Sequence, residues 1–254
     1  MGDGKIELEV LRLMEEGRPF VLATVVRGSG AVDTGSKAIF DSSGPIGGSL
    51  NGGALEEAVL SRVEKALSSG PELIETAGVA IFLDPHLPAA KLLICGAGHI
   101  AVPLARFGVE LGYGVTVIDD REDFASSARF PGCSTKVGDF PEMLGAFEFD
   151  RSTYAVVITR GHTHDVDCLF EILPRTTAYV GLIGSRRRTG FVKKDLAARG
   201  IPAEKLSGLF TPVGLAIGAD TPAEIALSIM AEITMVRRKG VPETRKARME
   251  EALS

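Results

Sequence analysis

The stretch of residues 91–101 decides the fold of the second half of the chain; it reads KLLICGAGHIA. Its apolar start, Lys91–Cys95, is typical of a buried strand, and apolar residues with helical spacing follow it. Gly96, Gly98 and Ala101 form the G-x-G-x-x-A variant of the dinucleotide-binding fingerprint. In that motif the first glycine permits a tight turn, the second lets backbone amides approach a phosphate, and the alanine lets the helix pack on the sheet. The stretch therefore predicts a Rossmann-like fold with a phosphate seat.

Strands and helices alternate downstream of this stretch. Apolar runs typical of strands occur at 115–118, 135–137, 154–159 and 178–183, and helical patterns occur at 165–173, 189–199 and 222–239. Alternation at this spacing predicts a doubly wound parallel sheet over residues 90–254.

Polar clusters follow the ends of these predicted strands. Because ligands in open α/β sheets lie outside the carboxyl ends of the strands, the clusters predict one site at that edge. Asp119 lies about 20 residues after the glycines, where a ribose-binding acid belongs, and its charge would favour NAD over NADP. The candidate residues at this edge are Gly96, Gly98, His99, Asp119, Asp120, Arg160, His162, Gly184, Ser185 and Arg186.

The chemistry of this edge can be interpreted in part. Gly184, Ser185 and Arg186 offer amides, a hydroxyl and a guanidinium at a helix start, which suits an anion. His162, His164 and Asp165 have donor atoms that a metal could use, but such a trio more often forms a hydrogen-bond network. No arrangement typical of a nucleophile and its base stands out, and the catalytic residues, if any exist, stay unknown.

Residues 1–84 have a different pattern and predict an N-terminal α+β domain. A helix is expected at 6–16 and another at 54–67, with short strands at 20–26, 36–40 and 46–50 and two more within 72–83. The segment 84–88 is the best linker candidate. Two glycine-rich segments provide further candidate residues, and the second is interpreted equally well as an anion seat or as a flexible hairpin. These candidates are Lys37, Ser49, Gly52, Gly53 and Glu56.

Composition excludes several classes of protein. The chain has 254 residues, with 28 Lys and Arg against 33 Asp and Glu, so its net charge of -5 argues against binding nucleic acid through overall charge. Three cysteines are too few for a disulfide framework. We find no leader-like start and no apolar run of about 18 residues, so we expect a cytoplasmic protein without a membrane span.

A series of short motifs spans nearly the whole chain. They are GS at 28–29, GSKA at 35–38, GSLNGGALE at 48–56, LICGAGH at 93–99, DDR at 119–121, RFP at 129–131, TRGH at 159–162, VGLIGSR at 180–186, TPVGLAIGADTP at 211–222 and EIA at 224–226. In this order they resemble the XdhC/CoxI family, accessory proteins for molybdenum hydroxylases such as xanthine and carbon monoxide dehydrogenases.

The resemblance implies a cofactor chaperone rather than an enzyme. It implies that the chain binds the molybdenum cofactor (molybdopterin), assists its sulfuration with a cysteine desulfurase, and delivers it to the apo-hydroxylase. It also implies a homodimer. The candidate residues of both halves would then contact the cofactor, whose terminal phosphate suits glycine-rich amides and Arg186.

Two positions depart from the family pattern. Ala54 stands where the pattern has Cys, so no thiolate can contact molybdenum or sulfur at that point. Residues 30–33 replace the usual Pro-Arg of the first loop. Two other functions therefore stay open: an NAD(P)-dependent oxidoreductase, suggested by Gly96, Gly98 and Asp119, or a nucleotide-binding scaffold without turnover.

Overall fold

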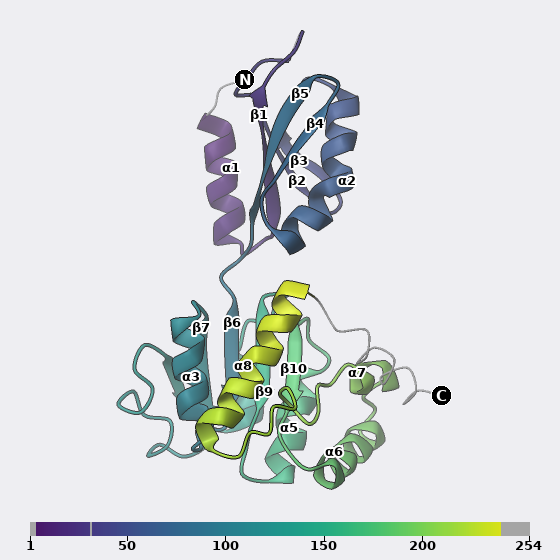
Figure 1. Ribbon diagram of the computed structural model, residues 1–254. Helices are drawn as coiled ribbons and strands as arrows, with labels where there is room; N and C mark the ends of the chain where they lie inside the picture. The colour runs from purple at the N-terminus through teal and green to yellow at the C-terminus, as the bar shows by residue number, and fades with distance from the viewer. Residues whose placement is uncertain (1–3, 31, 240–254) are drawn as a thin grey trace. The chain divides into compact units, whose positions relative to one another are not determined.

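The computed structural model describes residues 4–30 and 32–239, and the chain forms two compact units that divide between Pro88 and Ala89 (Figure 1). The first unit contains an antiparallel sheet and the second a parallel one. This confirms the predicted fold class, an α+β domain followed by a Rossmann-like domain. No helix among the described residues is long and apolar enough to cross a membrane.

The N-terminal unit has a five-stranded antiparallel sheet in the order β3-β2-β1-β5-β4. Its strands are β1 (Phe20–Arg27), β2 (Lys37–Asp41), β3 (Gly44–Gly48), β4 (Glu72–Thr76) and β5 (Val79–His86), and its helices are α1 (Gly4–Glu15) and α2 (Gly53–Ser69).

The two helices of this unit pack on opposite faces of the sheet, as Figure 1 shows. Side chains alternate between the faces along a strand, so Val21 and Ala23 of β1 pack with α2, whereas Phe20 and Leu22 pack with Leu13 of α1. The central strand β1 is therefore covered on both sides over its first half.

The β2–β3 hairpin was predicted, but its second strand begins earlier than expected. We expected that strand at 46–50, whereas β3 spans Gly44–Gly48 and includes Pro45. Proline is tolerated there because β3 lies at the edge of the sheet, where a strand need not donate on both sides. Asp41 closes the turn by accepting a hydrogen bond from the Ser43 amide at 2.8 Å.

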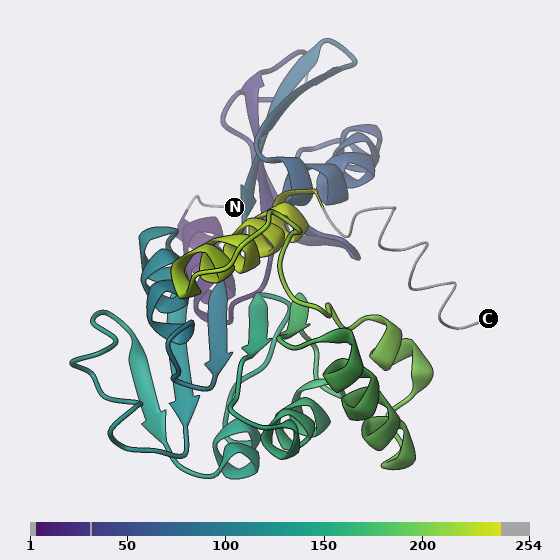
Figure 2. The ribbon, with the colours of Figure 1, turned by 60° about the horizontal axis from the view of Figure 1, so that its bottom comes forward.

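The C-terminal unit has a five-stranded parallel sheet in the order β10-β9-β6-β7-β8, shown in Figure 2. The strands are β6 (Lys91–Cys95), β7 (Gly114–Asp119), β8 (Ser134–Val137), β9 (Thr153–Val157) and β10 (Tyr179–Leu182). The helices are α3 (Ala101–Glu110), α4 (Phe140–Gly145), α5 (His162–Ile172), α6 (Arg186–Ala198), α7 (Ala203–Ser207) and α8 (Pro222–Lys239).

Helices cover both faces of this sheet. One core lies between the sheet and α3 with α8, and a second core lies between the sheet and α4 to α7. This is the doubly wound arrangement that the alternating pattern predicts. The short helices α4 and α7 were not predicted, because six and five residues are too few to show a clear apolar period.

Two helices of the C-terminal unit begin three residues earlier than the sequence pattern predicts. Helix α6 starts at Arg186 rather than at 189, because Ser185 caps it and accepts a hydrogen bond from the Arg188 amide at 3.3 Å. Helix α5 starts at His162 rather than at 165. Both starts lie directly after strand ends, so the helix beginnings belong to the carboxyl edge of the sheet.

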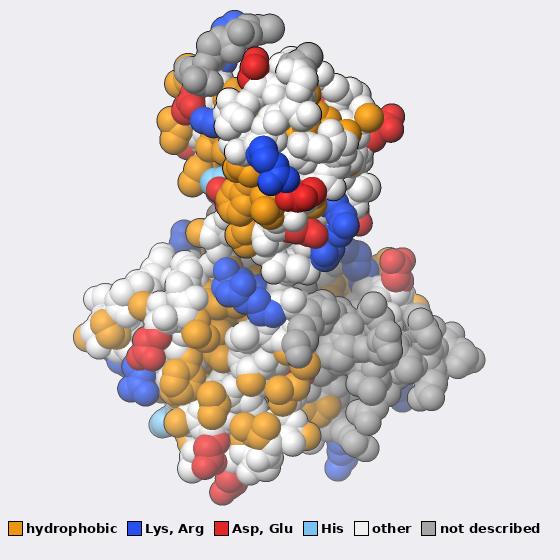
Figure 3. All heavy atoms as spheres, turned by 45° about the horizontal axis from the view of Figure 1, so that its top comes forward, with side chains coloured by type: hydrophobic (Ala, Val, Ile, Leu, Met, Phe, Trp, Pro, Cys, Tyr) orange, Lys and Arg blue, Asp and Glu red, His pale blue; other side chains and the backbone are white. Residues whose placement is uncertain are grey.

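Charge is mixed on the molecular surface. On the face seen in Figure 3, basic and acidic side chains are interspersed with hydrophobic ones on both units. A mixed surface of this kind agrees with the small net charge of -5.

The end of β3 depends on a glycine. Gly48 has a φ of 76°, and a Cβ there would lie 2.3 Å from the Lys37 carbonyl oxygen and 2.6 Å from Ile6 Cδ1. We predict that Gly48→Ala lowers the free energy of unfolding of the N-terminal unit by about 2 kcal/mol or more.

Gly53→Ala is the matched control, since a Cβ at Gly53 meets nothing within 4 Å, and we expect a change within about 0.5 kcal/mol. Urea unfolding followed by far-UV circular dichroism measures both variants. Tyrosine fluorescence serves as the internal reference, because the three tyrosines of this tryptophan-free chain, Tyr113, Tyr154 and Tyr179, lie in the C-terminal unit. Equal stability of the two variants would contradict the packing described.

Candidate functional site

The glycine loop, residues 96–100, follows β6 at the carboxyl edge of the parallel sheet. Gly96 has a φ of 106°, and a Cβ there would lie 2.6 Å from the Ile158 carbonyl oxygen, so close packing against the β9 end requires glycine. Gly98 differs, because a Cβ there would meet nothing within 4 Å. The protein's own packing therefore does not explain Gly98, and its open side leaves the backbone accessible to a ligand.

The backbone of Ala97 is held at both its N–H and its carbonyl group. The Asp119 Oδ2 atom accepts a hydrogen bond from the Ala97 N–H at 2.6 Å, and the Arg129 guanidinium donates to the Ala97 carbonyl oxygen at 3.0 Å. Arg129 also donates to the Phe124 carbonyl oxygen at 2.6 Å. Ala97 itself is fully buried. These contacts fix the shape of the glycine loop.

Asp119 is bound to Arg121 as well as to the loop. Arg121 Nε donates to Asp119 Oδ1 at 2.7 Å, Arg121 Nη2 donates to Oδ2 at 2.9 Å, and the Arg121 amide donates to Oδ1 at 3.1 Å. Burial alone would raise the pKa of Asp119, but the hydrogen bonds from Arg121 and Ala97 outweigh it and lower that pKa below its usual value. Asp119, to which the sequence pattern assigns ribose binding, thus holds the glycine loop in place.

Asp120 and Arg160 form an ion pair across the edge. Arg160 Nη2 donates to Asp120 Oδ2 at 2.6 Å. Asp120 follows β7 and Arg160 follows β9, and these strands lie on either side of β6. The pair therefore joins the two strand ends that flank the glycine loop, and both side chains stay partly exposed.

A buried network holds the ends of β9 and β10. The Asp165 carboxylate is fully buried; it accepts hydrogen bonds from Thr159 Oγ1 at 2.6 Å and from Arg188 Nε at 2.8 Å. Arg188 also donates to the Thr159 carbonyl oxygen at 3.3 Å. Gly184, which precedes α6, has a φ of 147°. The carboxylate and guanidinium thus connect the first turns of α5 and α6.

The sequence pattern predicts Arg186 at this point and does not point to Arg188, which donates to Asp165. The signal that could have found it is the helix start: with Ser185 as the cap, Arg188 lies in the first turn of α6. The side chains of Arg186 and His162 lie outside the described residues, so their predicted contacts stay predictions. The side chain of His99 is exposed.

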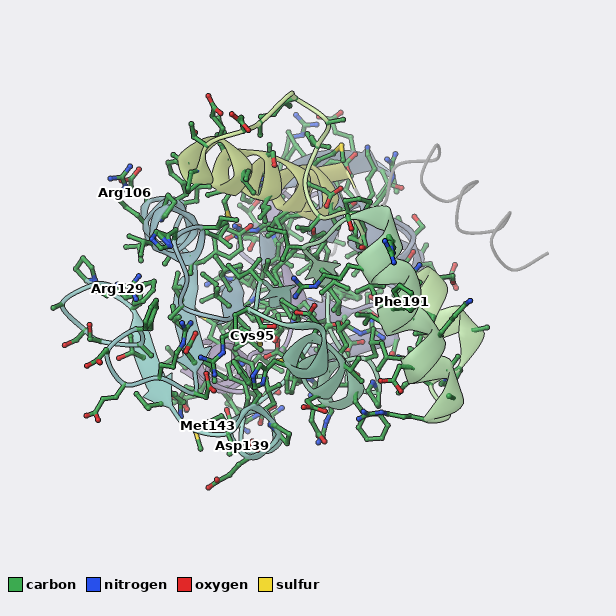
Figure 4. The ribbon with its side chains drawn as sticks, turned by 90° about the horizontal axis from the view of Figure 1, so that it is seen from below. Cys95, Arg106, Arg129, Asp139, Met143 and Phe191 are labelled. Atoms are coloured by element: carbon green, nitrogen blue, oxygen red, sulfur yellow. The ribbon has the colours of Figure 1, made fainter. Side chains whose placement is uncertain are left out.

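Figure 4 views this unit from the side on which the strands end, with Cys95 of β6 near the centre and Arg129 on the loop after β7.

Cys95 and Cys168 are buried, and burial raises the pKa of Cys168 well above its usual value. Burial also raises the pKa of Cys133. Neither shift favours a reactive thiolate. Among the side chains that the structure describes, no group of three or more His, Cys, Asp or Glu could hold a metal ion.

A groove of about 820 Å³ lies in the N-terminal unit, between α1 and the two glycine-rich segments. Lys37 and Ser49 line it, as do the apolar side chains of Ile6, Ile39 and Ile46. Lys37 Nζ donates to Glu7 Oε1 at 3.3 Å. The structure thus brings two of the five candidates of this unit to one groove.

The other three candidates of this unit lie at the start of α2, where the sequence predicts a helix N-terminus. Glu56 Oε1 accepts hydrogen bonds from Ser49 Oγ at 3.0 Å and from the Leu50 amide at 3.1 Å, so this carboxylate fixes the loop before α2. Gly52 is the N-cap of α2 with extended backbone and no side-chain cap, and Gly53 is the first residue of that helix. These three are not among the residues that line the groove.

The buried network makes a prediction about stability. Arg188→Ala removes the Arg188 guanidinium that donates to the buried Asp165 carboxylate, and we expect the free energy of unfolding of the C-terminal unit to fall by about 3 kcal/mol. The exposed neighbour provides the control: Arg187→Ala should change it by less than about 0.5 kcal/mol. Tyrosine fluorescence during urea unfolding measures both. If Arg188→Ala were as stable as Arg187→Ala, the network would not stabilise the edge.

Comparison with known proteins gives the family of the chain. A family model described as the XdhC and CoxI family matches residues 13–77, and a model described as the XdhC Rossmann domain matches residues 92–233. The chain is 26% identical over 248 residues to the uncharacterized protein YqeB of Escherichia coli (strain K12), covering 90% of the chain and 46% of that protein.

It is 36% identical over 160 residues to a probable xanthine dehydrogenase subunit of Bacillus subtilis (strain 168), covering 63% of the chain and 46% of that protein. The chain thus spans about half the length of these curated relatives. Among solved structures, a xanthine dehydrogenase from Bacillus halodurans has a TM-score of 0.53 and 20% identity, covering 94% of this chain and 99% of that one, which shows a shared fold. Together, the two family matches show that the chain belongs to the XdhC/CoxI family.

Proposed function

We propose that the chain assists the maturation of a molybdenum hydroxylase of the xanthine dehydrogenase type, by binding molybdenum cofactor and delivering it to the apo-enzyme. Membership of the XdhC/CoxI family supports the proposal. The Bacillus subtilis relative, which is named as a probable xanthine dehydrogenase subunit, supports the choice of hydroxylase.

The observation that carries cofactor binding is the open glycine loop. The backbone N–H groups of Gly98, His99 and Ile100 have no hydrogen-bond partner among the described residues, and no side chain caps α3. Three adjacent unpaired amides at the start of a helix suit a phosphate group. Molybdopterin has a terminal phosphate, so these residues fit it. At the same edge, Asp120 and Arg160 offer an acceptor and donors that suit the polar edge of a pterin.

In this proposal the chain binds and delivers the cofactor and performs no catalytic step. The cofactor supplies the redox-active metal that the hydroxylase uses. Burial raises the pKa of Cys168, so its thiol does not favour the thiolate form. Position 54 is alanine and supplies no thiol for sulfur transfer. Sulfuration would then depend on the desulfurase partner that the family resemblance implies. That partner, the homodimer and the cytoplasmic location stay predictions.

A glycine substitution tests the proposal. In Gly98→Val the added Cβ meets nothing within 4 Å, whereas the side chain blocks the approach of a phosphate. We expect molybdenum cofactor to bind about ten- to a hundredfold more weakly, as the loss of one or two charged hydrogen bonds implies. Equilibrium binding to the full chain measures this, with circular dichroism to confirm folding.

Gly145→Val is the matched control, because Gly145 at the end of α4 also has nothing within 4 Å of an added Cβ. It should bind the cofactor like the wild type. As a second readout, cofactor-loaded wild type should restore activity to apo-xanthine dehydrogenase better than loaded Gly98→Val does. A Gly98→Val protein that binds and delivers normally would remove the glycine loop from the proposal.

A further inference from the structure

We propose that the carboxyl edge of the C-terminal unit recognises the phosphate of its ligand and does not recognise a nucleotide ribose, because Arg121 occupies the acceptor sites of Asp119. The inference rests on the proposed function for the phosphate seat and deepens it by naming the ligand class. That class is a phosphate ester without a required ribose diol.

The acceptor sites of Asp119 are all in use. A carboxylate has about four lone-pair sites, two on each oxygen. Oδ1 accepts from the Arg121 amide and from Arg121 Nε, and Oδ2 accepts from the Ala97 amide and from Arg121 Nη2. A ribose diol needs two acceptor sites on this acid to be recognised, and none is left for it.

Arg121 is itself held in place. Its guanidinium carbon lies 3.6 Å from the centre of the Phe124 ring, on which it stacks. Asp119 is 1% exposed, so a ribose can reach its carboxylate only by displacing the guanidinium. A ribose would have to exchange two charged hydrogen bonds in a buried setting for two bonds from neutral hydroxyls, which are weaker. The exchange is therefore unfavourable for any nucleotide.

The phosphate seat does not share this constraint. The amides of Gly98, His99 and Ile100 are separate from Asp119, which contacts only the Ala97 peptide of the loop. Asp119 thus positions the glycine loop through Ala97 while its own acceptor sites are occupied. The arrangement keeps the phosphate-binding amides of a dinucleotide site and leaves no acceptor on Asp119 for the ribose.

Pyrophosphate and the nicotinamide dinucleotides provide the test. We expect wild-type protein to bind NAD and NADP no more than about threefold tighter than inorganic pyrophosphate in calorimetric titrations. Arg121→Ala opens two acceptor sites on Asp119, and we expect its affinity for NAD to rise about tenfold while pyrophosphate affinity stays unchanged. Arg121→Gln removes the charge with less loss of volume and provides a second variant should Arg121→Ala fold poorly.

Two controls accompany these variants. Arg106→Ala alters an exposed arginine of α3 that lies 3.8 Å from Glu110, and it should change neither affinity. Asp120→Asn tests the neighbouring acid: if wild-type NAD binding exceeded pyrophosphate binding and fell in this variant, Asp120 would bind ribose and the inference would be overturned.

The remaining outcomes separate this inference from the proposed function. Wild-type protein that binds NAD tenfold tighter than pyrophosphate overturns the inference and leaves the phosphate seat intact. Wild-type protein that binds neither pyrophosphate nor molybdenum cofactor overturns the proposed seat. In that case the NAD affinity of the two Arg121 variants tests whether Arg121 keeps ribose from Asp119. A higher NAD affinity than that of wild type supports the inference, and an unchanged affinity overturns it.

Discussion

The hydrogen bond from the Ala97 amide to the Asp119 carboxylate is the contact on which the carboxyl edge depends. It ties the loop after β6 to the end of β7, and Arg129 holds the same residue through the Ala97 carbonyl oxygen. The protein's own side chains consequently hold the glycine loop. A binding loop held in this way loses less entropy when it binds a ligand.

Two further charged pairs continue this arrangement along the sheet. Asp120 and Arg160 connect the strand ends on either side of β6, and Asp165 with Arg188 connects the helices that follow β9 and β10. The charged groups of the edge largely satisfy one another. The backbone N–H groups of residues 98–100 have no partner among the described residues, and backbone amides recognise a phosphate without requiring a particular organic group.

The sequence predicted the fold better than it predicted the site, and particular residues show why. Gly96 and the apolar strand before it predict a strand, a turn and a helix, because local sterics and periodicity decide those. Whether Asp119 faces a ligand or the chain's own Ala97 and Arg121 depends on contacts between separate strand ends, which spacing does not encode. Arg188 was missed for the same reason, since its role depends on Asp165, 23 residues earlier. In the N-terminal unit, only the folded chain brings Lys37 and Ser49 to a groove beside α1.

Amide NMR of the full chain during titration with molybdenum cofactor tests the central claim most directly, because it reports on each backbone N–H. The account predicts large shifts for the amides of Gly98, His99 and Ile100, with the Ala97 amide staying bonded to Asp119 and moving little. Shifts confined to residues outside the carboxyl edge, or an Ala97 amide that loses its hydrogen bond when the cofactor binds, would contradict it.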